Sequence, residues 1–154
     1  MNLFDLFKET QIIYEGEVVD LREKYRVSET EAFDGVACVY YDILNHNTKE
    51  KVGSCDLRFE NTGFMYYYGN IGYRIIEKYR GNSYAYEACK LLFKVAKEEF
   101  NMKELIITCC KENIASYKTL VKLNGEFIEE VEVPITHPLY ASGEYSKCIF
   151  KYFL

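Results

Sequence analysis

The residues that could do chemistry gather where an expected strand leads into an expected helix, in the segment GYRIIEKYRGNSYAYEACKLL, residues 72–92. The strand ends near Ile76, a turn with a glycine follows, and the helix begins near Tyr84. The first N–H groups of a helix have no partner within it, and the helix dipole adds partial positive charge at the same end. Such a turn can therefore bind an anion, and a phosphate in particular.

Three residues of this turn suit the binding of a phosphate. Arg80 offers a charged fork of donors, Gly81 lets a ligand approach the backbone closely, and Ser83 stands at the expected N-cap of the helix. A plain helix start beside a solvated arginine has the same pattern, so the turn alone does not decide the function. It is neither a Walker loop nor a G-x-G-x-x-G fingerprint.

Hydrophobic periodicity predicts the elements that must hold this turn. Apolar residues at helical spacing predict a helix over residues 84–100, and a short β-branched run predicts a buried strand over 105–110. A second helix is predicted over 113–123, closed by an Asn-Gly pair, and residues 2–9 have the pattern of a short amphipathic helix. The remaining strands are predicted over residues 11–27, 36–44, 52–59, 64–76, 126–133 and 145–153.

This order of elements predicts one domain over residues 1–154 with an α/β (α+β) fold. We expect a mixed, mostly antiparallel sheet of about six to seven strands with helices on its faces. A strand–helix–strand unit in the middle predicts a right-handed crossover and a local parallel pair. The six cysteines contain no C-x-x-C pair and lie mostly in apolar runs, which indicates free thiols in a reducing cytosol.

The composition argues against several classes of protein. A formal net charge of −5 disfavours nonspecific binding to nucleic acid, which needs a basic surface. The N-terminus has acidic residues and no long apolar stretch, and no apolar run is long enough to cross a membrane, so we expect a cytoplasmic protein without a membrane partner. Two isolated histidines and no clustered cysteines or carboxylates predict that no metal is bound.

Two stretches resemble motifs of the GNAT N-acetyltransferases. Residues 80–85, RGNSYA, resemble the coenzyme-A-binding pattern Gln/Arg-x-x-Gly-x-Gly/Ala of that family. The stretch ITCCKENIASYKTLVKLNGEF resembles its strand–Asn–helix segment, and Asn113 and Ser116 match the N-x-x-S form of members related to the ribosomal-protein-alanine acetyltransferases. The resemblance covers residues 52–128 well and implies the acyl-CoA N-acyltransferase fold of that family.

The resemblance implies acetyl-CoA as the co-substrate, held where the sheet splays between the fourth and fifth strands. The pantetheine arm would pair with the strand edge at Ile75 and Ile76, and the pyrophosphate would lie on the amides of residues 80–85. A backbone N–H near Ile75 would stabilise the developing oxyanion. The coenzyme-binding residues implied in this way are Ile75, Ile76, Arg80, Gly81, Asn82, Ser83, Tyr84, Ala85, Asn113 and Ser116.

The chain departs from the family pattern at two positions of the motifs. Ser83 replaces the central glycine, which would strain the backbone if that position requires a positive φ. Leu120 stands where many relatives place a tyrosine that protonates the leaving thiolate. We therefore expect Ser116 to be the thiolate's partner, with ordinary hydrogen bonding in the first helical turn as its alternative role.

The acceptor side is not implied by the resemblance, because only about eight residues separate the first two predicted strands, where the family usually has a helical pair. We expect His137, in the loop PITHP, to act as the base, with a plain loop histidine as the alternative. Tyr66, Tyr68 and Tyr140 are expected to line the acceptor site, with packing on the sheet as their alternative role.

The sequence thus predicts direct transfer of an acetyl group from acetyl-CoA to a primary amine of a small molecule or a peptide N-terminus. A noncatalytic acyl-CoA-binding regulatory module on the same fold is the alternative. A tyrosine-faced domain that binds nucleic acid or a protein partner is a third reading, which the negative charge disfavours. A homodimer is compatible with the sequence.

Overall fold

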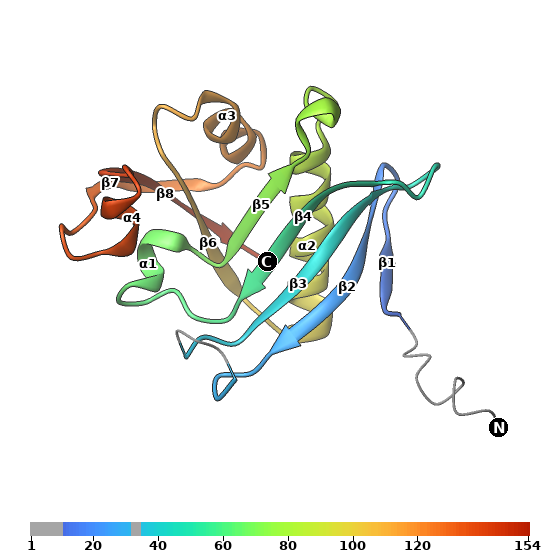
Figure 1. Ribbon diagram of the computed structural model, residues 1–154, viewed down its shortest axis with the longest axis horizontal. Helices are drawn as coiled ribbons and strands as arrows, with labels where there is room; N and C mark the ends of the chain where they lie inside the picture. Colours follow the sequence, from blue (N-terminus) through green and yellow to red (C-terminus); the bar gives the residue numbers. More distant parts are fainter. Residues whose placement is uncertain (1–10, 32–34) are drawn as a thin grey trace.

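The computed structural model describes residues 11–31 and 35–154, so the helix predicted over residues 2–9 lies outside the described residues. The elements, shown in Figure 1, are β1 (Ile13–Glu15), β2 (Val19–Val27), β3 (Cys38–Asn45), β4 (Lys51–Arg58), α1 (Met65–Tyr68), β5 (Ile71–Ile75), the 3-10 helix η1 (Glu77–Tyr79), α2 (Tyr84–Phe100), β6 (Glu104–Cys109), α3 (Ile114–Lys122), β7 (Glu126–Glu132), α4 (Pro138–Ala141) and β8 (Ser146–Phe153).

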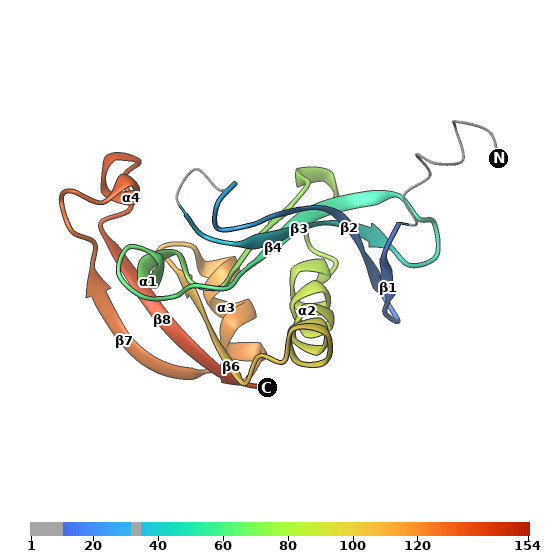
Figure 2. The ribbon, with the colours of Figure 1, turned by 90° about the horizontal axis from the view of Figure 1, so that it is seen from below.

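The strands form two antiparallel sheets that share one core. One sheet has five strands in the order β1-β2-β3-β4-β5, and the other has three in the order β6-β8-β7. Figure 2 shows α2 against one face of the five-stranded sheet, with α3 beside it and next to β6. Leu92 of α2 packs in the same buried cluster as Leu57 of β4 and Leu105 of β6, and complete burial of each leucine contributes about 1.5–3 kcal/mol.

The two sheets are hydrogen-bonded to each other at one end of β5 and β6. There the Asn70 N–H donates to the Ile106 carbonyl at 2.8 Å, and the Ile106 N–H donates to Asn70 Oδ1 at 2.9 Å. Gly69, with a φ of 73°, forms a bridge with Ile107, and a Cβ at Gly69 would lie 2.9 Å from the Ile106 carbonyl oxygen. Beyond this junction the sheets diverge, which is the splayed arrangement that the family resemblance implies.

The fold class is confirmed as α+β with mostly antiparallel strands, and the predicted helix over residues 84–100 is α2. The strands, however, number eight in the described residues and lie in two sheets rather than in one sheet of six to seven. The predicted parallel pair is also wrong, since β6 pairs with β8 and not with β5 among the described strands. The strand–helix–strand unit instead places β5 and β6 on the two sides of the splay.

Two predicted strands are divided in the structure. Residues 11–27 form the hairpin β1–β2, because the chain turns at Gly16, where a Cβ would lie only 2.4 Å from the Val19 carbonyl oxygen. Residues 64–76 contain the short helix α1 before β5, and Gly69 separates the two with its left-handed backbone. The three consecutive tyrosines therefore lie on a helical turn rather than on alternate faces of a strand.

Candidate active site

A groove of about 770 Å³ opens between the two sheets where β5 and β6 diverge. Its walls come from β5, the loop that leads into α2, the first turn of α2 and α3, and residues near the start of β8 close its other end. The groove brings together most of the residues that the sequence singled out. Those that line it are Tyr68, Ile75, Arg80, Gly81, Ser83, Tyr84, Ala85, Asn113 and Ser116.

The register of β5 decides which of its backbone groups face this groove. The Ile76 N–H donates to the Val52 carbonyl at 2.9 Å, and the Arg58 N–H donates to the Asn70 carbonyl at 2.7 Å. Backbone groups alternate in direction along an antiparallel strand, so Ile75 directs its N–H and C=O away from β4 and toward the groove. Ile75 thus keeps its N–H for an extended ligand, together with the carbonyl lone pair that Arg80 leaves unused. Ile76 cannot pair in the same way, because its N–H already donates to β4.

The loop into α2 presents unpaired backbone donors at the mouth of the groove. The Glu87 N–H donates to the Ser83 carbonyl at 3.0 Å, so the N–H groups of residues 84–86 have no partner within the helix. Arg80 donates through Nε to the Ile75 carbonyl at 3.1 Å, which leaves its two terminal nitrogens for an anion. Asn82 does not line the groove and instead donates from Nδ2 to the Tyr79 carbonyl at 2.9 Å, which closes the loop.

Ser83 occupies the N-cap position of α2 in a left-handed conformation, with a φ of 61° and a ψ of 21°. The cap position is as predicted, but the Ser83 side chain makes no capping hydrogen bond, because the left-handed backbone turns it away from the helix amides. Ser83 therefore has a backbone conformation that glycine would adopt at lower cost. Gly81, two residues earlier, also has a positive φ, of 86°.

Replacing Ser83 with glycine should raise the free energy of unfolding by about 1 kcal/mol, the typical penalty of a left-handed residue that has a Cβ. The change leaves the backbone donors of the loop in place. Urea unfolding measures the effect, and Ser54→Gly in β4 is the matched control, expected to lower stability by about 0.5–1 kcal/mol. Equal losses for both variants would show that Ser83 carries no strain.

Ser116 lies midway along the groove, and a tyrosine from the opposite wall reaches it. Asn113 caps α3 by accepting the Ser116 N–H at 3.2 Å, so the first turn of the helix is fixed. The hydroxyl of Tyr73, on β5, lies 2.6 Å from Ser116 Oγ. Burial raises the pKa of Tyr73 to about 12, so its proton is present at neutral pH. Leu120 is completely buried and takes no part in the groove.

Tyr73 was not among the residues predicted from the sequence. The available signal was the alternation along β5, where residues two apart share one side of the strand, so Tyr73 lies on the same side as Ile71 and Ile75. Nothing in the sequence reveals that this side faces Ser116, because the two residues are brought together only by the packing of α3 over the splay.

Cations line the groove of a chain that is acidic as a whole. Lys118 and Lys122 come from α3, and the Lys122 ammonium lies 4.1 Å from the ring centre of Tyr86 on α2. The other end carries Lys147 and Glu144, whose Nζ and Oε1 are 2.9 Å apart. Glu144 is the one carboxylate among the described residues that line the groove. One end of the groove thus suits an anionic ligand, and the other offers a carboxylate.

Glu144 is held in its ionised form. Burial alone would raise the pKa of its carboxyl, but hydrogen bonds from Lys147 and from the Cys110 thiol lower that pKa below its ordinary value. An ionised carboxylate at this end can bind an ammonium group.

His137 lies outside the groove, contrary to its expected role as the base. It is 1% exposed, and its Nδ1 accepts the Leu139 N–H at 3.0 Å. Nε2 therefore carries the proton and donates it to the Phe64 carbonyl at 2.9 Å. With both ring nitrogens engaged, His137 fastens α4 to the residues before α1 and has no nitrogen free to accept a proton from a substrate.

Of the three tyrosines expected to line the acceptor site, the structure places one in the groove. Tyr68 lines the groove, but Tyr66 and Tyr140 do not. Tyr140 packs edge-on against Tyr145, with ring centres 4.9 Å apart, beside a different hollow along β7. The segment before β8 faces the groove through Leu139 of α4 and through Glu144 instead.

Comparison with protein families identifies the chain. Residues 7–126 match the model of the acetyltransferase (GNAT) domain, and the chain belongs to this family of acetyltransferases. Comparison with the curated proteins finds no match.

Solved structures share the fold at low sequence identity. The GNAT acetyltransferase from Bacillus anthracis is 20% identical with a TM-score of 0.60, and the match covers 74% of this chain but only 65% of that one. The ribosomal-protein-S5-alanine acetyltransferase from Vibrio fischeri is 13% identical with a TM-score of 0.64, over 92% and 96% of the two chains. The RimL ribosomal α-N-protein acetyltransferase in complex with coenzyme A is 12% identical with a TM-score of 0.67, over 93% and 98%.

The described residues offer neither a metal cluster nor a membrane-spanning helix. Across residues 11–31 and 35–154, no three histidine, cysteine, aspartate or glutamate side chains form a group that could hold a metal ion. In the same residues, no helix is both long and apolar enough to cross a membrane.

Proposed function

We propose that this protein transfers the acetyl group of acetyl-CoA directly to a primary amine of a small molecule or of a peptide N-terminus. The observation that carries the proposal is the groove itself: free backbone donors and Arg80 stand at its mouth, and the free edge of β5 leads from them past Ser116. Support comes from the family match and from the complex of RimL with coenzyme A.

The groove offers partners for the pyrophosphate, the pantetheine arm and the thioester of the coenzyme. The N–H groups of residues 84–86 and the Arg80 guanidinium would hold the pyrophosphate, and Lys118 and Lys122 add positive charge beside them. The outward N–H and C=O of Ile75 would pair with the amides of the pantetheine arm. Acetyl-CoA supplies the activated thioester, and the N–H of Tyr73, which faces the groove two residues before Ile75, would donate to the carbonyl oxygen as it gains negative charge.

Ser116 and Tyr73 would manage the proton that the leaving thiolate needs. A phenol is a stronger acid than an alcohol, so the Tyr73 O–H donates to Ser116 Oγ across their 2.6 Å contact. Ser116 then keeps its own O–H free to donate toward the sulfur. In this proposal the pair takes the place of the family tyrosine that Leu120 replaces.

Glu144 would receive the acceptor amine at the far end of the groove. Its ionised carboxylate can bind and orient the incoming ammonium, which would lose its proton to water before attack. Neighbours named as ribosomal-protein acetyltransferases support a peptide N-terminus as the acceptor, with a small amine as the other acceptor class.

Binding of acetyl-CoA is the first test. At one hundred times its Kd the ligand should stabilise the fold by about 2.7 kcal/mol, which raises the Tm of a chain of this size by roughly 5–10 °C. Differential scanning fluorimetry measures the shift. Arg80→Ala should weaken binding about tenfold, the equivalent of about 1.4 kcal/mol, while Lys78→Ala in the adjacent η1 serves as the control. No shift at millimolar acetyl-CoA would refute the proposal.

Release of free thiol then separates catalysis from mere binding. A panel of amines and of short peptides is incubated with acetyl-CoA and the protein, and the free thiol is detected. Binding without thiol release for any acceptor would favour the noncatalytic regulatory module.

A further inference from the structure

The turn between β3 and β4, residues 45–50, lies beside the loop into α2, although the two are far apart in the sequence. Asn45 donates from Nδ2 to the Tyr84 hydroxyl at 2.9 Å, and the Tyr79 hydroxyl donates to the Glu50 carboxylate at 3.3 Å. Tyr79 ends η1 and Tyr84 begins α2, so the pair brackets the turn that carries Arg80. One hairpin turn is thus bonded to both ends of the loop.

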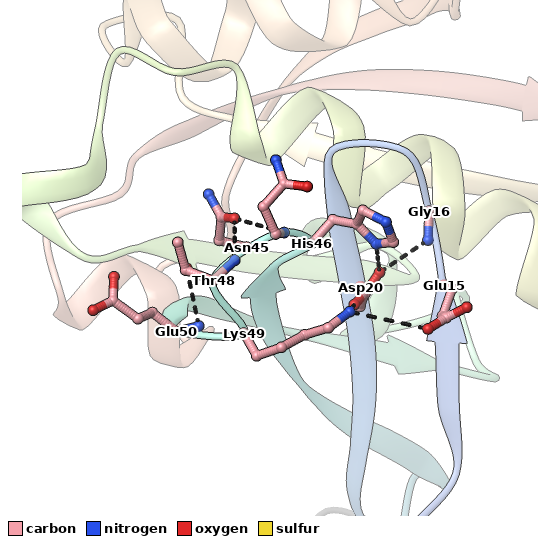
Figure 3. Close-up of polar contacts among 9 residues, drawn as sticks. Glu15, Gly16, Asp20, Asn45, His46, Thr48, Lys49 and Glu50 are labelled. Carbon is pink, nitrogen blue, oxygen red and sulfur yellow. Dashed lines mark hydrogen bonds and ion pairs between the residues drawn. The ribbon is translucent and has the colours of Figure 1, made fainter.

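The β3–β4 turn is itself held firmly, and Asn45 is its centre. Asn45 Oδ1 accepts the N–H groups of Asn47 at 2.9 Å and Thr48 at 3.0 Å, and the Asn45 carbonyl accepts the Lys49 N–H at 2.8 Å. The Thr48 hydroxyl accepts the Glu50 N–H at 3.2 Å, as Figure 3 shows. With these bonds the amide of Asn45 has a fixed direction, and its remaining donor is aimed at Tyr84.

A buried carboxylate of the neighbouring hairpin anchors this turn. Asp20, on β2, is completely buried, and its Oδ1 lies 2.8 Å from His46 Nδ1 while Oδ2 lies 2.5 Å from Lys49 Nζ. The Gly16 N–H donates to the same carboxylate at 3.2 Å. Figure 3 shows Lys49 extended from the turn toward Asp20 and Glu15.

Asp20 keeps its charge in this environment. Burial alone would raise the pKa of its carboxyl, but the hydrogen bonds from Lys49 and His46 bring that pKa below its ordinary value. A buried charge is tolerated only while its partners remain, so Asp20 holds both side chains of the turn in place.

We infer that the β3–β4 turn, anchored on Asp20, is a support that fixes the loop into α2, and that Asn45 is a positioning residue for acetyl-CoA. The turn closes through its own hydrogen bonds, so it offers fixed partners to Tyr79 and Tyr84 on the two sides of the loop. A loop ordered before the ligand arrives loses less entropy on binding, which improves affinity. The inference rests on the proposed coenzyme role of that loop.

The test compares Asn45→Ala and Tyr84→Phe, which remove the two sides of one hydrogen bond. Each variant should raise the Kd for acetyl-CoA by about three- to tenfold, the range for one lost hydrogen bond. Because both substitutions remove the same contact, the Kd of the double variant should be no higher than the higher Kd of the two single variants. Isothermal titration calorimetry measures the three constants, and Asn47→Ala, an exposed residue of the same turn, should leave Kd unchanged.

Hydrogen exchange gives a second measurement that needs no ligand. In the unliganded protein, Asn45→Ala and Tyr84→Phe should each speed the exchange of the Glu87 amide, which closes the first turn of α2, whereas Asn47→Ala should not. If Asn45→Ala does not fold, Tyr84→Phe decides alone, since it loses only a hydroxyl.

Unchanged Kd and unchanged exchange for a folded variant would overturn the inference while leaving the proposed function intact. Wild-type protein that binds no acetyl-CoA would contradict the proposed function instead, and the exchange rates would still decide whether the turn supports the loop. If the losses of binding free energy in the two single variants add up in the double variant, Asn45 does not act through Tyr84.

Discussion

Replacing Asn70 with alanine is expected to lower the free energy of unfolding by about 2–4 kcal/mol. Asn70 is 2% exposed and joins the two sheets at the point where they meet. Its Nδ2 donates to the Arg58 carbonyl at 2.9 Å, and its Oδ1 accepts the Ile106 N–H at 2.9 Å. Alanine would leave a buried donor and a buried acceptor without partners, and each such group costs about 1–3 kcal/mol. Urea unfolding measures the loss.

Asn61→Ala is the matched control for this experiment. Asn61 donates to the same Oδ1 of Asn70 at 3.1 Å but is itself only partly buried, so its loss should cost less than about 1 kcal/mol. Equal losses for the two variants would show that the junction of the sheets does not depend on Asn70.

Strong local patterns made part of the fold predictable. The helix over residues 84–100 was predicted at its observed bounds, because apolar residues repeat at helical spacing over more than four turns. Residues 11–27 and 64–76 were each predicted as one strand, since β-rich residues run across the points where the chain turns. The breaks come from single glycines at 16 and 69, whose neighbours in space, Val19 and Ile106, decide the backbone path.

The site was predictable where it depends on backbone and not where it depends on packing. The loop over residues 80–85 follows from a glycine-bearing turn before a helix, and the structure places it at the mouth of the groove. Ile75 and Ile76 could not be told apart, because the direction of each N–H depends on the register with β4. His137 was expected to act in chemistry from its residue type and its place in the loop PITHP, and its burial depends on contacts with residues before and within α1.

The second large effect is expected at Ser116 and Tyr73. If Ser116 protonates the leaving thiolate, Ser116→Ala should lower kcat by about 100-fold or more, the usual contribution of a general acid. Tyr73→Phe should lower kcat by about tenfold, since it removes the donor that directs the Ser116 hydroxyl across 2.6 Å. Neither change removes a group that we place on the pyrophosphate, so the Kd for acetyl-CoA should stay within about twofold. Thiol release with the acceptor found in the amine screen measures kcat.

The double variant shows whether the two residues act as one unit. If Tyr73 works only through Ser116, adding Tyr73→Phe to Ser116→Ala should cause no further loss of kcat, whereas independent roles would multiply the two losses. Tyr117→Phe is the control, because Tyr117 is on the same helix and packs against Phe150 rather than against Ser116. Wild-type kcat in Ser116→Ala would remove the serine from the mechanism and leave water in the groove as the proton donor. A loss in Tyr73→Phe that persists in full without Ser116 would instead make the tyrosine itself the acid, because its hydroxyl would then reach the sulfur without the serine between them.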